Sequence, residues 1–170
     1  RRSLPVVGRS SITSARTSRS LDTDARRFRP TAPDPALAHD VLFVGNSRNT
    51  QRHGVAWAAA VELPLTVYGS GWEGRIPPAL VRDTYYPNEE LGRLYASAKV
   101  VLNDHWPDMA RMGFVSNRVF DVLGAGGVVV SDPVPGMEEL FGDLVPTYSP
   151  ADFSPGRPAR LLTSRWVRGH

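Results

Sequence analysis

Residues 116–141, SNRVFDVLGAGGVVVSDPVPGMEELF, carry the most informative pattern in the chain. Its pattern predicts a helix, a glycine turn, a buried strand and a short second helix. At about 100° per residue, the polar side chains of Asn117, Arg118 and Asp121 fall within roughly 100° of one another, and apolar residues fill the opposite arc. A helix with one polar face, followed by glycines and a valine strand, is a common way for an α/β fold to present a ligand site.

The residues before this stretch indicate strands that alternate with helices. Short apolar runs predict buried strands, and a helical period begins at Asn88, which we expect to be its N-cap. This alternation predicts an α/β fold class, a Rossmann-like parallel sheet with helices on both faces. The expected elements are strands at 41–45, 65–68, 85–86, 100–103, 128–131 and 144–146, helices at 51–62, 88–98, 116–123 and 136–141, a short helix opened by Pro77-Pro78, and a loop over 104–115.

Composition bounds the class of protein. The chain has 170 residues, 41% of them hydrophobic and 22% charged, which suits one soluble domain with a real core. There is no cysteine, so disulfides and thiolate metal sites are excluded. No apolar run approaches the ~20 residues of a membrane span, and no signal peptide is visible, so we expect a cytoplasmic protein without a transmembrane segment.

The positive charge of the chain is concentrated at its two ends. Residues 1–30 and 151–170 hold 12 of the 20 basic residues but only 3 of the 17 acidic ones. Residues 31–150 therefore hold 8 basic and 14 acidic residues, a net charge of −6. A nucleic-acid-binding domain carries its positive charge on the fold itself, so we do not expect nucleic acid as a partner.

Composition also predicts the domain boundaries. Residues 1–23 are rich in Arg and Ser, lack helical or strand periodicity, and are expected to be disordered or a remnant. Residues 24–39 are typical of an interdomain linker, and residues 40–149 form the predicted Rossmann-like domain. Residues 150–170 are expected to be a disordered basic tail. We add the hypothesis that the chain is a fragment of a longer reading frame.

Ligands bind at the carboxyl ends of the strands in such sheets, so polar residues there are candidates. Gly45, Asn46 and Arg48 follow the first strand, where a glycine allows a phosphate to approach the backbone and arginine pairs with its oxygens. An ordinary glycine turn with a solvent-facing arginine is the structural alternative. The sequence has neither G-x-G-x-x-G nor a Walker motif, so neither a dinucleotide fold nor a P-loop is supported.

A second group of candidates follows the strand at 100–103. Asn103 ends that strand, and His105 is a candidate general acid or base, with an ordinary loop histidine as the alternative. The nearby acids lack the spacing of a metal cluster, so no metal is expected. Ser116 is a natural N-cap, and the same helix start can receive a diphosphate. Arg118 adds a positive charge there, unless it pairs with Asp121 three residues later.

The residues of this helix and of the strand after it resemble the donor-binding, C-terminal half of GT-B glycosyltransferases. Within that fold the resemblance points to the bacterial group-1-like branch that includes the spore-maturation CgeB-like proteins. Their pattern S-N-R-x-F-[ED]-x-L-x-x-G precedes a buried strand and a further short helix. The matching residues are Ser116, Asn117, Arg118, Phe120, Asp121, Leu123 and Gly126, then Gly136, Met137, Glu139, Leu140 and Phe141.

The resemblance implies roles for individual residues. Asp121 stands where the family has a glutamate that accepts hydrogen bonds from the donor's ribose, and Arg118 stands beside the diphosphate. Tyr86 belongs to a loop that contacts the nucleotide base in similar proteins, with packing of its ring in the core as the structural alternative. Many retaining members carry a second glutamate eight positions before the first, where this chain has Gly113. The resemblance also implies binding without a metal or other cofactor.

The function implied is transfer of a sugar from a nucleoside-diphosphate sugar to an acceptor hydroxyl, as in a hexosyltransferase. In GT-B proteins an N-terminal domain supplies the acceptor site. Residues 1–23 are too few to form it, so we expect the isolated chain to be inactive and its acceptor unknown. Two alternatives stay open: a nucleotide-sugar epimerase of GT-B shape and a non-catalytic α/β nucleotide-binding fragment.

Overall fold

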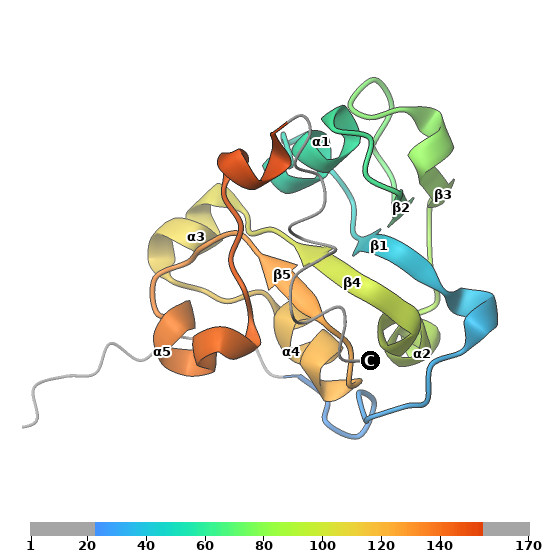
Figure 1. Ribbon diagram of the computed structural model, residues 1–170, viewed down its shortest axis with the longest axis vertical. Helices are drawn as coiled ribbons and strands as arrows, with labels where there is room; N and C mark the ends of the chain where they lie inside the picture. The colour runs from blue at the N-terminus through green and yellow to red at the C-terminus, as the bar shows by residue number, and fades with distance from the viewer. Residues whose placement is uncertain (1–22, 155–170) are drawn as a thin grey trace, which may run out of the picture.

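Strands and helices alternate along the chain in the computed structural model, which describes residues 23–154 (Figure 1). The strands are β1 (His39–Val44), β2 (Leu65–Tyr68), β3 (Val81–Asp83), β4 (Ala98–Asn103) and β5 (Val129–Ser131). The α-helices are α1 (His53–Ala60), α2 (Leu91–Ser97), α3 (Pro107–Met112), α4 (Asn117–Gly124) and α5 (Met137–Phe141). Short 3-10 helices are η1 (Pro35–Leu37), η2 (Pro78–Leu80), η3 (Asn88–Glu90), η4 (Gly142–Leu144) and η5 (Pro150–Phe153).

The five strands form one parallel sheet in the order β3-β2-β1-β4-β5. Val41 of β1 pairs with Leu65 of β2 on one side and with Val100 of β4 on the other. The chain therefore places β2 and β3 on one side of β1 and then crosses over to place β4 and β5 on the other side. The predicted α/β class with a parallel sheet is confirmed, and the switch point of the topology lies between β1 and β4.

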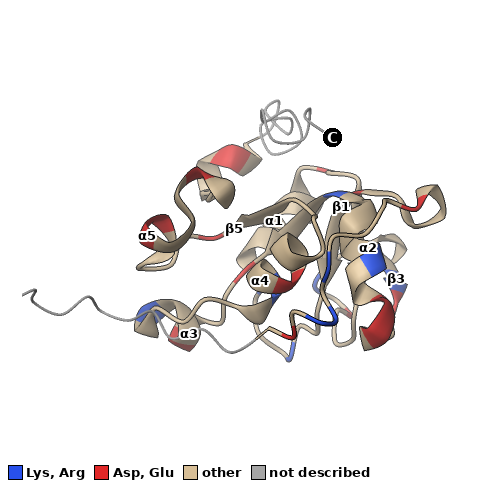
Figure 2. Ribbon diagram, turned by 90° about the horizontal axis from the view of Figure 1, so that it is seen from below, with Lys and Arg blue, Asp and Glu red and all other residues tan. Residues whose placement is uncertain are grey.

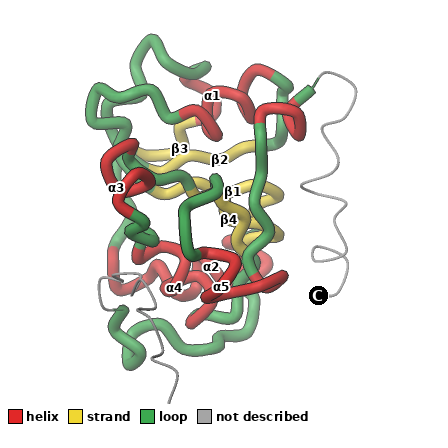
Figure 3. Tube along the Cα trace, turned by 90° about the vertical axis from the view of Figure 1, so that its left-hand side faces the viewer, coloured by secondary structure: helices red, strands yellow, loops and turns green. Residues whose placement is uncertain are grey.

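Helices cover both faces of the sheet, as the tube in Figure 3 shows, with α1 on one side and α2, α4 and α5 on the other. The alternation of side chains along β1 explains this arrangement, because neighbouring residues of a strand point to opposite faces. Leu42 is buried among residues of α2 and α4, whereas Val41 and Phe43 are buried on the α1 side with Val55. The central strands are therefore apolar on both faces, as parallel strands usually are.

Several local expectations are wrong. Tyr85-Tyr86 is not a strand, because β3 occupies residues 81–83 beside β2. Asn88 is not an N-cap but lies inside η3. The expected loop over 104–115 contains α3, which starts with Pro107 and is followed by Gly113 in the left-handed region as its C-cap. The expected strand at 144–146 is replaced by η4 and a single bridge between Ser131 and Thr147.

The segments that flank the sheet are packed against it. The ring of Phe28 is buried and stacks on Tyr95, with centroids 6.3 Å apart, so the predicted linker 24–39 lies on the domain. A capping box between Ser149 and Asp152 opens η5, and Phe153 is buried. Residues 150–154 are thus folded, and the boundary predicted at 149 falls too early. Residues 1–22 and 155–170, both expected to be disordered, lie outside the described residues.

Candidate functional site

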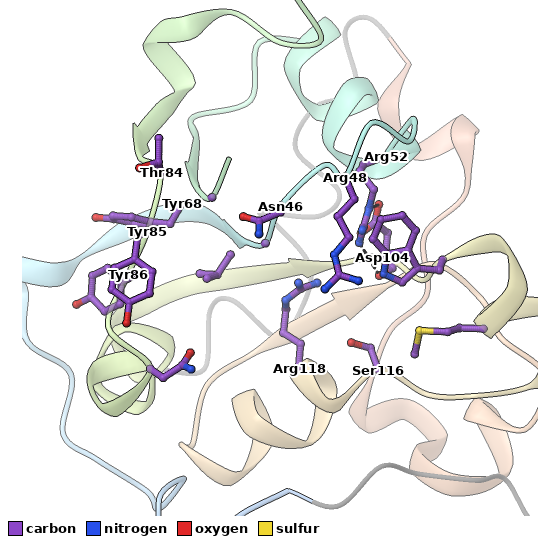
Figure 4. A pocket seen from close by; sticks show the side chains of 16 residues that line it. Asn46, Arg48, Arg52, Tyr68, Thr84, Tyr85, Tyr86, Asp104, Ser116 and Arg118 are labelled. Atoms are coloured by element: carbon purple, nitrogen blue, oxygen red, sulfur yellow. Dashed lines mark hydrogen bonds and ion pairs between the residues drawn. The ribbon is translucent and has the colours of Figure 1, made fainter. Parts of the chain in front are cut away.

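A cleft of about 490 Å³ opens at the carboxyl edge of the sheet, above β1, β2 and β4 and beside the start of α4 (Figure 4). This is the switch-point location at which parallel α/β sheets bind ligands. It is lined by Val44, Gly45, Asn46, Arg48, Arg52, Tyr68, Gly69, Thr84, Tyr85, Tyr86, Asn88, Asp104, Trp106, Met109, Ser116 and Arg118. Figure 4 shows the arginines gathered at one end and the tyrosines at the other.

Arg118 enters the cleft from the first turn of α4. Its Nη1 donates a hydrogen bond of 2.9 Å to Oδ1 of Asn103, and its guanidinium lies 4.7 Å from the ring centroid of Phe43. A side chain on Gly45 would collide with it, since a Cβ there would lie 2.7 Å from Nη2 of Arg118. Neutral groups thus hold this guanidinium in place, and its charge stays available to a ligand.

Arg48 comes from the turn after β1, whose backbone is unusual. Arg48 and Asn49 both have positive φ angles, of 50° and 58°. Hydrogen bonds fix the turn: Asn46 Oδ1 accepts the Ser70 N–H at 2.8 Å, the Ser47 N–H donates to Ser70 O at 3.0 Å, and the Ser47 hydroxyl donates to Gly71 O. The turn carries the exposed Arg48 side chain to the cleft.

Arg52 and Asp104 form a buried ion pair that sequence reasoning missed. Nε of Arg52 donates to the two carboxylate oxygens at 3.0 and 2.9 Å, and its Nη2 also reaches the Asp104 backbone oxygen at 3.2 Å. The two side chains are only 5% and 6% exposed. The pair joins the start of α1 to the end of β4, 52 residues later. Asp104 at a strand end is the signal that could have found it.

The opposite end of the cleft is aromatic. Tyr68 ends β2, and its ring meets that of Tyr86 edge to face, with centroids 4.9 Å apart. Burial raises the pKa of Tyr86 above its ordinary value, so this phenol stays neutral at physiological pH. Tyr85, next to it, is 64% exposed. An exposed ring beside a half-buried one offers a flat apolar face to a ligand.

His105 is buried, and the residues that line the cleft do not include it. Its Nδ1 lies 2.6 Å from Oδ1 of Asp132, and its Nε2 accepts the backbone N–H of Ser116 at 2.9 Å. This pattern requires the proton on Nδ1, so both ring nitrogens are already engaged. The candidate general acid or base therefore braces the start of α4 against the end of β5.

Besides His105, three of the nine predicted donor-binding residues lie outside the cleft, and six line it. Those inside are Gly45, Asn46, Arg48, Tyr86, Ser116 and Arg118. Asn103 lies beneath the cleft, where it is fully buried and also donates to Ser131 Oγ at 2.8 Å. Oδ1 of Asn117 is buried and makes no hydrogen bond within residues 23–154. Ser116 precedes α4, but its side chain makes no capping hydrogen bond.

Asp121 is likewise outside the cleft. Its Oδ1 accepts a hydrogen bond of 2.9 Å from the hydroxyl of Thr23, the first described residue. Burial raises the pKa of the Asp121 carboxyl, and the Thr23 hydrogen bond and the Arg118 charge oppose that rise. The i+3 pairing considered for Arg118 and Asp121 is not among the ion pairs of the described residues.

The cleft is positive although the fold is acidic. Three of the eight basic residues between positions 31 and 150 line it, whereas Asp104 is its one acidic residue, already paired with Arg52. Acidic side chains lie elsewhere, for example on α5 (Figure 2). Among residues 23–154 no three His, Asp or Glu side chains gather as a metal site would require. Nor does that part of the chain hold a helix suited to crossing a membrane.

Comparison with known proteins identifies a family and a similar fold. Residues 49–154 match the model of a family described as glycosyl transferase-like. A solved structure, AviGT4, a glycosyltransferase involved in avilamycin A biosynthesis, is similar with a TM-score of 0.54 and 21% sequence identity. The match covers 84% of this chain and 47% of AviGT4, so the chain spans about half the length of that protein. No curated protein matched in sequence.

Proposed function

The chain belongs to the glycosyl transferase-like family, and we propose that its cleft binds the nucleoside-diphosphate part of a sugar donor. One observation carries the proposal: Arg48 and Arg118 lie together at the switch point of the sheet, with tyrosines at the other end of the same cleft. A diphosphate needs concentrated positive charge and N–H donors, and a nucleotide base needs a flat apolar surface. The cleft offers positive charge at one end and aromatic surface at the other.

In this arrangement the diphosphate lies against Arg118 and Arg48, and the base lies against Tyr85 and Tyr86. Arg52 stays with Asp104 and serves as the floor of the phosphate site. Asn103 aims Arg118 through the hydrogen bond to its Nη1. Asn117, at the start of α4, and Asp121, one turn later, are proposed to reach the ribose, which requires Thr23 to leave the Asp121 carboxylate.

The proposed reaction is sugar transfer by a two-half enzyme of the CgeB-like branch, in which this chain is the donor half. The bond between the anomeric carbon and the diphosphate oxygen breaks, and a bond to the acceptor oxygen forms. Negative charge grows on the departing diphosphate, so Arg118 and Arg48 stabilise the transition state more than the ground state. The other half supplies the acceptor and the group that takes its proton.

Isothermal titration with UDP and GDP tests the proposal. We expect weak binding by the isolated chain and a loss of about ten- to a hundredfold in Arg118→Met, because a charge-assisted contact of about 1.5–3 kcal/mol disappears. Methionine keeps the packing of the aliphatic stem. Arg111→Met is the matched control, since Arg111 is 76% exposed and does not line the cleft.

Two results would contradict the proposal. Equal affinities of the wild-type chain and Arg118→Met would remove Arg118 from the phosphate site. Sugar transfer or donor hydrolysis by the isolated chain would show that no second half is needed for chemistry.

A further inference from the structure

We propose that Trp106 is a positioning residue, whose indole holds the Arg48 guanidinium at the phosphate end of the cleft. Trp106 directly precedes α3, is half-buried and lines the cleft. The guanidinium carbon of Arg48 lies 5.4 Å from the centroid of its ring, and that of Arg52 lies 4.5 Å away. Both distances are within the range of a cation–π contact. The inference rests on the proposed function, because it concerns the affinity of that site for phosphate.

The two arginines differ in what else holds them. Arg52 is buried and hydrogen-bonded to the carboxylate and the backbone oxygen of Asp104, so it stays in place without the indole. Arg48 is exposed, and within residues 23–154 no carboxylate pairs with it. A long, exposed arginine samples many rotamers, and fixing it for a ligand costs entropy. An aromatic face beside the guanidinium reduces that cost before the ligand arrives.

The backbone under Arg48 supports the same reading. Arg48 and Asn49 both occupy the left-handed region, which asparagine adopts readily but arginine rarely does. Such strain persists where the surroundings fix it, and it gathers at ligand sites. Here Ser47 fixes it: its carbonyl accepts the Thr50 N–H at 3.1 Å, and its hydroxyl is bonded to Gly71. The turn sets the direction in which Arg48 leaves the backbone, and Trp106 limits where its charged end lies.

The chemistry predicts which substitutions matter. Trp106→Leu removes the π face and should weaken UDP and GDP binding about three- to fivefold, the usual worth of an exposed cation–π contact. Trp106→Phe keeps an aromatic face and should stay within about twofold of the wild type. If residue 106 only packed against the aliphatic part of the Arg48 side chain, Trp106→Leu and Trp106→Phe would weaken nucleotide binding equally.

A double-mutant cycle between Trp106→Leu and Arg48→Met tests the inference. Affinities for UDP and GDP are measured for the wild type, both single variants and the double variant, with thermal melts to check folding. We expect Trp106→Leu to weaken binding in the wild type and to have no further effect once residue 48 is methionine. The same loss in both backgrounds, or equal losses for Trp106→Leu and Trp106→Phe, would overturn the inference.

The cycle separates this inference from the proposed function. Binding of UDP or GDP without coupling between residues 48 and 106 keeps the function and removes the role of Trp106. If neither nucleotide binds, the proposed function fails, and the same cycle is measured with inorganic pyrophosphate. Coupling in pyrophosphate binding then supports the positioning role, while no binding or no coupling overturns it.

Discussion

The two ends of the cleft are built in opposite ways. At the arginine end, Arg118 and Arg52 come from the starts of α4 and α1, and buried partners fix both guanidinium groups. At the tyrosine end, Tyr85 lies on the stretch between β3 and η3 and is 64% exposed. The side chains are thus held most firmly where the cleft places its positive charge. On the proposed function, the phosphate site is preformed, whereas the base site can adjust to more than one base.

Removing the Asp104 side chain should have the largest effect, a loss of folding stability that originates at the arginine end of the cleft. Asp104→Ala leaves Arg52 buried without its counter-ion, so we expect a loss of about 3–5 kcal/mol in the free energy of unfolding. Urea denaturation followed by circular dichroism measures it. Asp108→Ala is the control, because the exposed Asp108–Arg111 pair should contribute less than about 1 kcal/mol. Equal losses in the two variants would show that the buried pair is no more important than the exposed one.

Gly45→Ala should disturb the same end without unfolding the protein. The new Cβ would lie 2.7 Å from Nη2 of Arg118 and 3.2 Å from Cε1 of Phe43. The flexible arginine moves aside, so we expect UDP affinity to fall about tenfold, or ~1.4 kcal/mol, with a smaller change in stability. Titration and thermal melts measure the two effects. Gly92→Ala, where a Cβ meets only ordinary contacts, is the control; unchanged affinity in Gly45→Ala would contradict the assigned position of Arg118.

Tyr85→Ala should show that the tyrosine end contributes less and discriminates weakly. Loss of one stacked ring should cost about 1 kcal/mol of nucleotide affinity, the lower end of the usual range, and about equally for UDP and GDP. Tyr85→Phe keeps the ring and should bind like the wild type. Titration of both nucleotides against both variants measures this. A loss confined to one nucleotide would mean that this end reads the base by more than stacking.

The smallest effect concerns Asp121, which lies beyond the arginine end. Because burial raises the folded-state pKa of this carboxyl, its contribution to stability is complete below the unfolded pKa and is lost as the pH rises through the folded pKa. Asp121→Asn should therefore gain stability at pH 7, by less than about 0.5 kcal/mol, and the gain should vanish near pH 3 to 4. Melts across pH measure it. If the stability gain of Asp121→Asn increased as the pH fell, the folded-state pKa of Asp121 would not be raised.

Much of the fold was predictable because its signals are local. The buried strands are short apolar runs, and β2 lies at the predicted residues 65–68. The α3 helix was missed although Pro107 and Gly113 mark its two ends, because six residues are too few to show a period. A strand was predicted at Tyr85-Tyr86, but pairing with β2 selected residues 81–83 instead. Tertiary pairing overrode local preference there.

The residues of the candidate site also fall into those that the sequence predicts and those that it does not. Gly45, Arg48, Ser116 and Arg118 were predictable from the strand-end rule together with the helix start. The strand-end rule also marks Asp104, but its pairing with Arg52 was not predictable, because nothing in a sequence links two charges on separate elements. His105 was predicted as a loop residue open to chemistry, and only three-dimensional packing reveals that its ring is enclosed between Asp132 and Ser116.

The order of the strands has a consequence for how the molecule is made. The central strand β1 gains one neighbour soon, from β2, but its other neighbour is β4, where His39 meets Ala98. A ribosome must therefore release more than half of the described chain before the middle of the sheet can close. Such distant pairings slow folding. The cleft spans this late seam, so a nucleotide that binds there would favour completion of the sheet and protect the newly made domain from unfolding.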